Sequence, residues 1–333
     1  MKRRLLLLFY ALMSILGIFR VFYWLNRYRR SQITFHNVLP DALLDGSPDL
    51  GMCHPVSVFE CQVALIGRRM ELSAINEGPY GPLITFDDGY INQGEVAAPI
   101  LEKHGMRGQF FVPLESIENG VTLAVDQLQM WVSYAPPGTY QLLGQTWQID
   151  DADRPALCAT LFQELLRHPQ QWNTLSAQLD QAFPLAQLAL PEAVRRLRFV
   201  PLDGPALKAL AARGHHIACH SWDHHPLALL PDDLLQSQMR QCWEQHGQHC
   251  NDHGFCYPFG RPAEVSPAVA RACKEAGFSH AFLCTPTRPS HYAGLETFAL
   301  PRISLPCLET HTFILDAKLS GFETFVKRIL RSA

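Results

Sequence analysis

Short apolar runs alternate with longer amphipathic segments along most of the chain. The run at residues 83–86 lies between Gly-Pro and Asp-Asp-Gly, which is typical of a buried strand. The same reasoning predicts strands at 33–35, 108–113, 216–219, 255–257 and 281–284, and helices at 58–70, 97–104, 205–213, 234–245 and 267–276. Strands that alternate with helices indicate a parallel α/β barrel or open sheet. Reactive residues in such folds lie at the carboxyl ends of the strands.

Residues 152–198 depart from this alternation, because they read as consecutive helical segments. Pro169, Pro184 and Pro191 separate these segments. No Gly/Ser linker, internal repeat or low-complexity tract divides the rest of the chain. We therefore predict one catalytic domain over residues 31–330, with a helical insert at about 118–200.

Residues 5–25 form an almost wholly apolar stretch, with basic residues on both sides within 2–4 and 27–30. As one continuous helix, this stretch would span about 31 Å, enough for the core of a bilayer. Arg20 inside it costs about 2.5–3.5 kcal/mol at mid-bilayer and less near a helix end. We predict a membrane-associated helix within residues 1–30, at an inner membrane. It either spans the bilayer or lies in its surface.

The net charge limits the kinds of partner this protein can bind, and the cysteine content indicates its cellular compartment. The net charge is −3 over 333 residues, so the chain has no basic field for nucleic acid and we expect no such partner. The ten cysteines form no CxxC pair. Scattered thiols favour a reducing compartment, which predicts a catalytic domain on the cytoplasmic side.

The first polar cluster follows the strand predicted at 83–86 and reads Thr-Phe-Asp87-Asp88-Gly89. Two adjacent carboxylates in an apolar pocket repel each other unless a cation or a proton lies between them. Gly89 allows the chain to turn sharply after them. Asp-Gly is also common in plain turns, so this motif alone does not decide between a site and a turn.

The second cluster, at residues 220–225, reads His-Ser-Trp-Asp-His-His. Histidines four positions apart, His220 and His224, share one face of a helical turn and can converge on one metal. With one Asp oxygen they would form a two-His-one-carboxylate site that leaves positions open for water and substrate. Two alternatives stay open: a histidine pair without a metal, and His225 in place of His224.

The third cluster reads Cys256-Tyr-Pro-Phe259-Gly260 and follows the strand predicted at 255–257. A Pro-aromatic-Gly turn can point a backbone N–H into a pocket, as an oxyanion hole requires. A plain turn from strand to helix is the alternative.

The motifs TFDDG, HSxxH and YPFG, in this order, resemble those of the polysaccharide deacetylases, the NodB-homology family also called carbohydrate esterase family 4. The resemblance extends from about residue 33 to residue 321 and implies a distorted, incomplete (β/α) barrel that hydrolyses acetyl groups on sugars. By position, Asp87 matches the catalytic base, and the Phe259 N–H matches the oxyanion donor. The residues that match the ligands of one divalent metal, for which we expect zinc, are Asp88, His220 and His224. We prefer His224 to His225 because the Pro-Leu that follows then falls in the family's usual place.

Two features of the common family pattern are missing. Cys256 stands where the family often has an arginine that orients the base, and the Leu-His motif of the general acid has no good match, His311 being a poor one. Residues 33–38 (ITFHNV) resemble instead the Tyr-His-x-Val segment of a branch that acts on surface glycans. That resemblance implies that His36 is the acid.

Residues 300–303 (Leu-Pro-Arg-Ile) resemble a further feature of the same branch. Arg302 would then supply the missing cation beside Asp87. A surface arginine is the alternative interpretation.

Together these residues predict a metal-dependent hydrolase that removes N-acetyl or O-acetyl groups from a cell-envelope polysaccharide or lipid-linked sugar. Its partners would be an acetylated amino-sugar glycan or glycolipid and a membrane surface, contacted through residues 5–25. A catalytically weak sugar-binding member of the same fold and a sugar deformylase are the alternatives. The Cys/His-rich stretch at 246–256 keeps no zinc-finger spacing, so we expect no second zinc site there.

Overall fold

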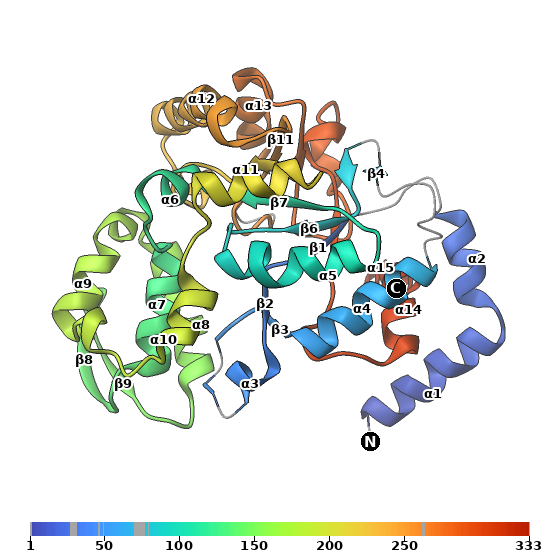
Figure 1. Cartoon of the computed structure of the whole chain (residues 1–333), viewed down its shortest axis with the longest axis horizontal. Helices are drawn as coiled ribbons and strands as arrows, with labels where there is room; N and C mark the ends of the chain where they lie inside the picture. The colour runs from blue at the N-terminus through green and yellow to red at the C-terminus, as the bar shows by residue number, and fades with distance from the viewer. Residues whose placement is uncertain are drawn as a thin grey trace.

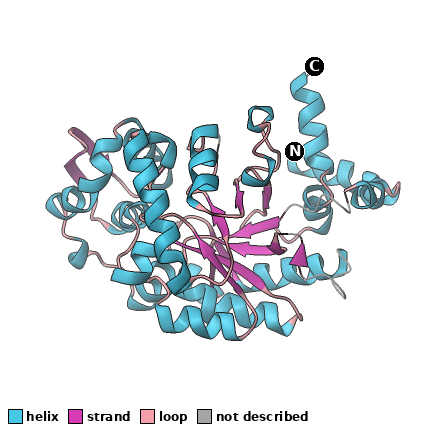
Figure 2. Cartoon of the chain, turned by 90° about the horizontal axis from the view of Figure 1, so that it is seen from above, coloured by secondary structure: helices cyan, strands magenta, loops and turns pink. Residues whose placement is uncertain are grey.

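Seven parallel strands form the central sheet, and helices surround it (Figures 1 and 2). The computed structural model describes residues 2–26, 32–45, 47–48, 50–69, 77–78, 80–261 and 264–332. In sheet order the strands are β12 (His280–Phe282), β11 (Gly254–Cys256), β10 (His216–Cys219), β7 (Gly108–Val112), β6 (Ile84–Phe86), β1 (Gln32–Phe35) and β13 (Arg302–Ser304). All the strands predicted from apolar runs are present. β13, which was not predicted, pairs with β1 at the edge of the sheet.

The two outer strands of the sheet meet through the segments that adjoin them. The Leu283 N–H donates to the Leu300 carbonyl at 2.8 Å, and the Arg302 N–H donates to the Thr285 carbonyl at 2.9 Å. The chain that leaves β12 therefore lies beside the chain that enters β13, and the sheet is a nearly closed barrel. The predicted fold class, a distorted and incomplete (β/α) barrel, is confirmed.

Helices cover the outer face of the barrel and enclose the main apolar core against it. They are α4 (Val56–Arg69), the π-helical turn η1 (Gln93–Ala97) that continues into α5 (Ala98–Lys103), α11 (Gly204–Ala212), α12 (Asp232–His249) and α13 (Pro267–Ala276). Asp203 caps α11 by accepting from the Ala206 N–H, and Ser266 caps α13 by accepting from the Val269 N–H. All the helices predicted for this layer are present.

Short elements lie between these strands and helices or within the lobe described next. They are α3 (Asp41–Leu44), the pairs β2 (Asn37–Leu39) with β3 (Cys53–Pro55) and β4 (Glu77–Gly78) with β5 (Gly81–Pro82), and the 3₁₀ turns η2 (Pro169–Thr174), η3 (Leu185–Gln187), η5 (Leu227–Leu229), η6 (Ser290–Tyr292) and η7 (Glu296–Phe298).

Residues 114–199 form a lobe at one end of the barrel, on the left of Figure 1. It contains α6 (Leu114–Asn119), α7 (Ala124–Tyr134), the hairpin β8 (Gly138–Leu142) and β9 (Gln145–Ile149), α8 (Arg154–Arg167), α9 (Leu175–Ala182), α10 (Glu192–Val194) and the π-helical turn η4 (Arg195–Phe199). Its own apolar core includes Trp131, Leu161 and Leu175. The sequence predicts helices here but not the hairpin, whose turn places Leu143 and Gly144 at φ 55° and 72°. Leu-Gly is not one of the dipeptides that announce such a turn.

The prediction of one continuous apolar helix over residues 5–25 is wrong. The structure has two helices, α1 (Lys2–Ile15) and α2 (Ile18–Leu25), which meet at an angle of 71°. Gly17 lies between them at φ 73°, a left-handed conformation that ends α1. Within the described part of the chain, no single helix has the length and apolarity to cross a bilayer, and the bent pair meets that test only jointly. The basic residues at 27–30, which follow the apolar stretch, lie outside the described residues.

The two N-terminal helices pack against the end of the chain. Tyr10 and Phe19 are buried against Ile314 of α14 (Thr312–Leu319) and Phe322 of α15 (Phe322–Ser332). Figure 1 shows α1 and α2 beside these C-terminal helices, on the side of the barrel away from the insert.

Candidate active site

Loops at the carboxyl ends of four strands surround one cavity of about 490 Å³. The loops after β1, β6, β10 and β11 contribute His36, then Asp87 and Asp88, then His220 and His224, and finally Phe259. Arg302 reaches Asp87 from within the barrel. The structure thus brings together all the residues predicted for the site, although their roles stay predictions.

These loops hold unusual backbone conformations. Among the described residues, five that are not glycine have a positive φ, and four of them belong to these loops: Asp88, Ser221, His224 and Phe259. Such conformations cost of order 1–3 kcal/mol and persist where the surrounding structure enforces them. Here the Ser221 hydroxyl accepts the His224 N–H at 3.0 Å, which fixes the turn that aims His224. Strain concentrated around one cavity supports a functional role for it.

Asp88, His220 and His224 form a group of acceptor atoms that fits a metal ion. Asp88 Oδ1 lies 3.3 Å from His220 Nε2 and 3.1 Å from His224 Nε2, and all three side chains are buried. His220 Nδ1 lies 2.7 Å from the Cys256 carbonyl, so this nitrogen carries the proton and Nε2 presents a lone pair. A lone pair facing a carboxylate oxygen in a dry site requires a cation or a proton between them.

The pKa shifts in this group have the same electrostatic origin. Burial alone would raise the pKa of Asp88, but the two histidines outweigh it and hold the pKa well below the usual range. Burial alone would lower the pKa of His224, but Asp88 outweighs it and raises the pKa. Both shifts show that the pocket favours positive charge beside an ionised Asp88.

His225, the alternative ligand, points elsewhere. Its Nδ1 lies 3.6 Å from Asp223 Oδ2, and its ring packs 5.1 Å from the ring of Trp172. Of the described residues, only His220 and His224 join Asp88 in a group with metal-binding spacing. The geometry favours His224.

The second oxygen of Asp88 is held by a chain of buried groups that the sequence did not indicate. The Tyr90 hydroxyl lies 2.9 Å from Asp88 Oδ2 and also 2.9 Å from Asp126 Oδ2. Arg198 pairs with Asp126 Oδ1 at 3.0 Å and stacks over the Tyr90 ring, 4.8 Å from its centroid. Asp126 lies on α7 and Arg198 on η4, so the insert supports the metal side of the cavity.

Asp87 is held differently, by a two-point ion pair. Arg302 Nη1 and Nη2 each lie 2.6 Å from one oxygen of Asp87, and Arg302 is 1% exposed. Burial alone would raise the pKa of Asp87, but the charge and hydrogen bonds of Arg302 outweigh it and lower the pKa. Arg302 is therefore not a surface arginine. It is the cation beside Asp87 that the resemblance implied.

Asp87, His220 and Cys256 form a second group with metal-binding spacing. Both oxygens of Asp87 already bind Arg302, whose Nη2 also lies 2.9 Å from Cys256 Sγ. Burial raises the pKa of the Cys256 thiol well above its ordinary value, which disfavours the thiolate that a metal needs. The Asp88 group is the better metal site.

His36 lies on the Asp87 side of the cavity. Its Nε2 is 3.9 Å from Asp87 Oδ2, and Gln93 Nε2 donates to the His36 carbonyl at 2.9 Å. Burial lowers the pKa of His36, although Asp88 and Asp87 act in the opposite direction. His311, the other candidate acid, precedes α14 and does not line the cavity.

An apolar wall faces these polar groups across the cavity. Val125 and Leu128 of α7 and Phe162 of α8 line it. The Phe259 ring lies 4.8 Å from the His224 ring and 5.1 Å from the Phe162 ring, so it joins the metal group to the insert. Gly260 follows Phe259 at φ 60°, and a Cβ there would lie 2.4 Å from the Cys284 nitrogen, so only glycine fits this turn.

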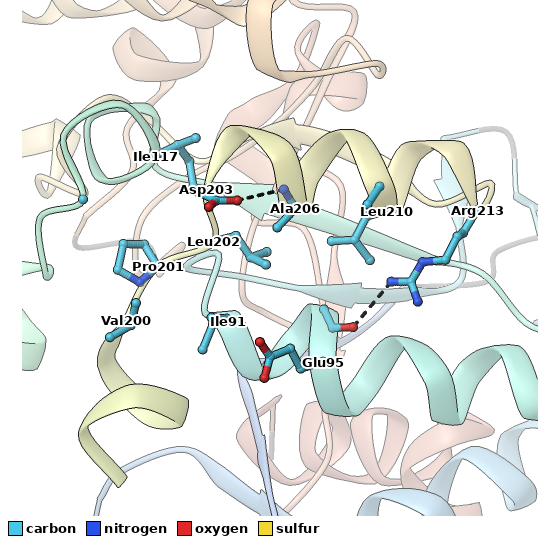
Figure 3. A pocket seen from close by; sticks show the side chains of 13 residues that line it. Ile91, Glu95, Ile117, Val200, Pro201, Leu202, Asp203, Ala206, Leu210 and Arg213 are labelled. Carbon is cyan, nitrogen blue, oxygen red and sulfur yellow. Dashed lines mark hydrogen bonds between the residues drawn. The ribbon is translucent and has the colours of Figure 1, made fainter. Parts of the chain in front are cut away.

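A second cavity, of about 480 Å³, lies between η1 and α11 (Figure 3). Its charged lining residues are Glu95, Asp203 and Arg213. Asp203 caps α11, and Arg213 Nη2 lies 3.4 Å from the Gly94 carbonyl. None of the residues predicted for the site lines it.

The Cys/His-rich stretch has structural contacts of its own. His246 Nε2 lies 2.7 Å from the Asp252 carbonyl, and His249 Nε2 lies 3.3 Å from Glu118 Oε1. Among the described residues, both groups with metal-binding spacing lie at the first cavity, not in this stretch.

Comparison with known proteins agrees with this geometry. Residues 191–281 match the family model described as polysaccharide deacetylase, and this range contains His220, His224 and Phe259. The fold is similar to that of the Streptococcus pyogenes deacetylase PplD in complex with acetate, with a TM-score of 0.51, 14% identity, and coverage of 86% of this chain and 97% of that chain. It is also similar to a polysaccharide deacetylase from Bacillus cereus, with a TM-score of 0.50, 12% identity, and coverage of 86% of this chain and 68% of that chain.

No curated protein matches the sequence. The family match covers β10, β11 and the start of β12 with the loops that carry the second and third motifs, and the similarity to the first of these structures covers 86% of this chain. Residues 191–281 therefore resemble the polysaccharide deacetylases in sequence, and the chain as a whole shares the fold of solved deacetylases.

Proposed function

We propose that this protein is a metal-dependent hydrolase that removes N-acetyl or O-acetyl groups from a cell-envelope polysaccharide or lipid-linked sugar. The observation that carries the proposal is the pair of adjacent carboxylates with separate partners. Asp88 faces two histidine nitrogens, as a metal ligand would, and Asp87 is kept ionised by Arg302, as a base would be. Binding a sugar without hydrolysing it requires no such base, which disfavours the non-catalytic alternative.

Asp88, His220 and His224 would hold one divalent metal, for which zinc is our expectation because two imidazoles and one carboxylate suit it. When bound, such a metal polarises a carbonyl and lowers the pKa of water. The Tyr90 hydroxyl occupies the space at Asp88 Oδ2, which leaves Oδ1 to face the metal.

The remaining chemistry belongs to the chain itself. Asp87 accepts the proton of the attacking water, and Arg302 fixes the orientation of this carboxylate. The Phe259 N–H donates to the oxyanion that develops on the acetyl group. His36 donates a proton to the leaving amine, and its lowered pKa makes its protonated form a stronger acid.

The test is acetate release from a panel of acetylated sugars and lipid-linked sugars, with zinc, with a chelator, and with zinc restored. We expect activity that follows the metal. Asp87→Asn is the control for contaminating esterases, because it should keep the metal and lose the activity. Formate release from formylated sugars, with no acetate release from any substrate, would identify a deformylase instead.

We also propose that the protein associates with a membrane surface through residues 5–25, at an inner membrane with the catalytic domain on the cytoplasmic side. Supporting the first part, α1 and α2 expose large apolar side chains such as Leu8, Ile15 and Trp24. Supporting the second, none of the ten cysteines, all of which lie among the described residues, forms a disulfide. Protease digestion of intact spheroplasts and of inverted vesicles tests on which side of the membrane the domain lies. A cytoplasmic domain should be cleaved only in the inverted vesicles.

A further inference from the structure

Exposed apolar side chains gather at one place on this protein. Of the 18 large apolar residues exposed among those described, 12 belong to α1, α2 and α15, and Leu16 lies in the turn that joins α1 to α2. The C-terminal helix contributes Phe325, Ile329 and Leu330, which are 48%, 50% and 72% exposed. Single exposed apolar residues are ordinary, but a contiguous group of this size marks an interaction surface.

The three helices make one continuous surface. The Phe22 ring of α2 lies 5.3 Å from the Phe322 ring and 5.2 Å from the Phe325 ring. Phe325 lies three positions after Phe322, and Ile329 lies seven positions after Phe322. These side chains therefore lie along one stripe of α15. Figure 2 shows the C-terminal helix projecting from the body of the molecule, which leaves its far end accessible.

This surface also carries positive charge in a chain whose net charge is −3. Among the residues whose side chains the structure describes, residues 3–25 contain three basic residues and no acidic one, and residues 322–330 contain two basic residues and one acidic one. Arg3 lies 3.2 Å from Glu309. The acidic residue, Glu323, is paired with Lys318 at 3.0 Å and with Lys327. An apolar stripe bordered by cations complements a membrane surface of anionic lipids.

We propose that α15 and the bent pair α1–α2 form one membrane-binding surface that lies within the headgroup region of an anionic bilayer and does not cross it. This rests on the membrane attachment proposed above and adds a second, C-terminal element to it. The crossing arrangement is disfavoured because Tyr10 and Phe19, on the inner sides of α1 and α2, are only 7% and 4% exposed. Spanning would strip both from α14 and α15, and would break the hydrogen bond from the Tyr23 hydroxyl to Asp316 Oδ1 at 3.0 Å.

The experiment is flotation of the full-length protein with vesicles of phosphatidylcholine alone and of phosphatidylcholine with phosphatidylglycerol. We expect binding to the anionic vesicles that weakens in high salt, and little binding to the neutral ones. The triple variant Phe325→Ser, Ile329→Ser, Leu330→Ser should lower the partition coefficient at least about tenfold, which is a loss of about 1.4 kcal/mol. The matched control is Val121→Ser with Leu234→Ser, two exposed apolar residues on other elements, which should bind as the parent does.

Acetate release from a small soluble sugar is measured on the same samples. Because α15 does not line the active-site cavity, the triple variant should keep this activity, so failure of the membrane proposal and failure of the enzymatic proposal are distinguishable. If the triple variant melts at a lower temperature than the parent, Leu330→Ser alone, at the most exposed position, replaces it.

Three results would overturn the proposal. The triple variant could bind vesicles as tightly as the parent, which would exclude α15. The protein could stay in the membrane pellet through alkaline carbonate extraction, which would show a spanning segment. A parent dimer that the triple variant dissociates, with no vesicle binding by either, would show that the surface is a contact between two copies.

Discussion

The carboxylates of Asp87 and Asp88 are adjacent in the chain, yet different parts of the molecule hold them. Asp87 is fixed from inside the barrel, by the two-point contact with Arg302, which also binds the Thr85 hydroxyl at 3.1 Å. Asp88 is supported from the insert, through Tyr90 and the pair formed by Asp126 and Arg198. The barrel therefore positions the proposed base, and the insert positions the proposed metal ligand.

The two carboxylates also differ in what neutralises them. Asp87 has a full cation, Arg302, at 2.6 Å, so its charge is balanced within the protein. Asp88 Oδ1 faces two histidine nitrogens, and among the described residues its Oδ2 receives the neutral Tyr90 hydroxyl and no cation. The cationic Arg198 is paired with Asp126 and not with Asp88. The comparison shows why a metal is expected beside one carboxylate and not beside the other.

Removal of a metal ligand should have the largest effect. Asp88→Ala, His220→Ala and His224→Ala each delete one of three protein ligands, and we expect loss of bound zinc, measured by plasma mass spectrometry, with turnover below detection. His225→Ala is the matched control and should keep both. Full metal occupancy in His224→Ala would show that the ligand set is wrong.

We expect the second largest effect from replacing Asp87, the carboxylate that the barrel positions. Asp87→Asn should keep its zinc but lose about 10²–10⁴-fold in kcat, because the amide cannot accept the proton of the water. It also leaves Arg302 buried without its charged partner, so the variant should be assayed well below its melting temperature. A kcat close to that of the parent would mean that Asp87 has a structural role only.

His36 lies on the Asp87 side of the cavity, and His36→Ala tests whether it protonates the leaving group. We expect a loss of about 10²-fold on an N-acetyl sugar, at the lower end of general-acid effects, and a much smaller loss on an aryl acetate, whose leaving group needs no proton. Metal content should not change. Equal losses on the two substrates would falsify the acid role.

We expect the smallest effect from removing the hydroxyl that supports Asp88, and comparison with a hydroxyl near Asp87 separates the two carboxylates. Tyr90→Phe removes the hydroxyl that holds Asp88 Oδ2, and we expect a weakening of zinc affinity by about 10–100-fold in a chelator competition, with kcat restored at saturating zinc. Thr85→Val removes the corresponding hydroxyl on the Asp87 side and should leave zinc affinity unchanged. If both variants bind zinc equally well, the insert does not support the metal site.

The sequence predicted the parts of the site that are local. Asp87, Asp88, His220, His224 and Phe259 each follow an apolar run by one to a few residues, so identifying the strands also placed these side chains at one edge of the barrel. Parallel pairing then brings them together without any further information. His36 was found in the same way, although only a resemblance assigned it a role.

The parts that depend on distant pairing were missed or left open. Asp126 and Arg198 lie in a region that reads only as helices, and nothing local indicates that they meet beneath Tyr90. Arg302 was proposed beside Asp87 with a surface arginine as the alternative, because its strand, β13, is only three residues long. The bend after α1 was missed because the apolar stretch was treated as continuous across Gly17.

The position of Arg302 has a consequence for the order in which the protein is made. Asp87 is separated from its cation by 215 residues, and β13 also provides the contacts that close the barrel. A nascent chain that ends before residue 302 therefore has an open barrel edge and a carboxylate with no partner to balance its burial. Contacts so distant in sequence form late, because the entropy of closing the intervening loop must be overcome first. The proposed site becomes complete in the same step that closes the barrel, so an unfinished chain carries the motifs without the arrangement on which the proposed activity depends.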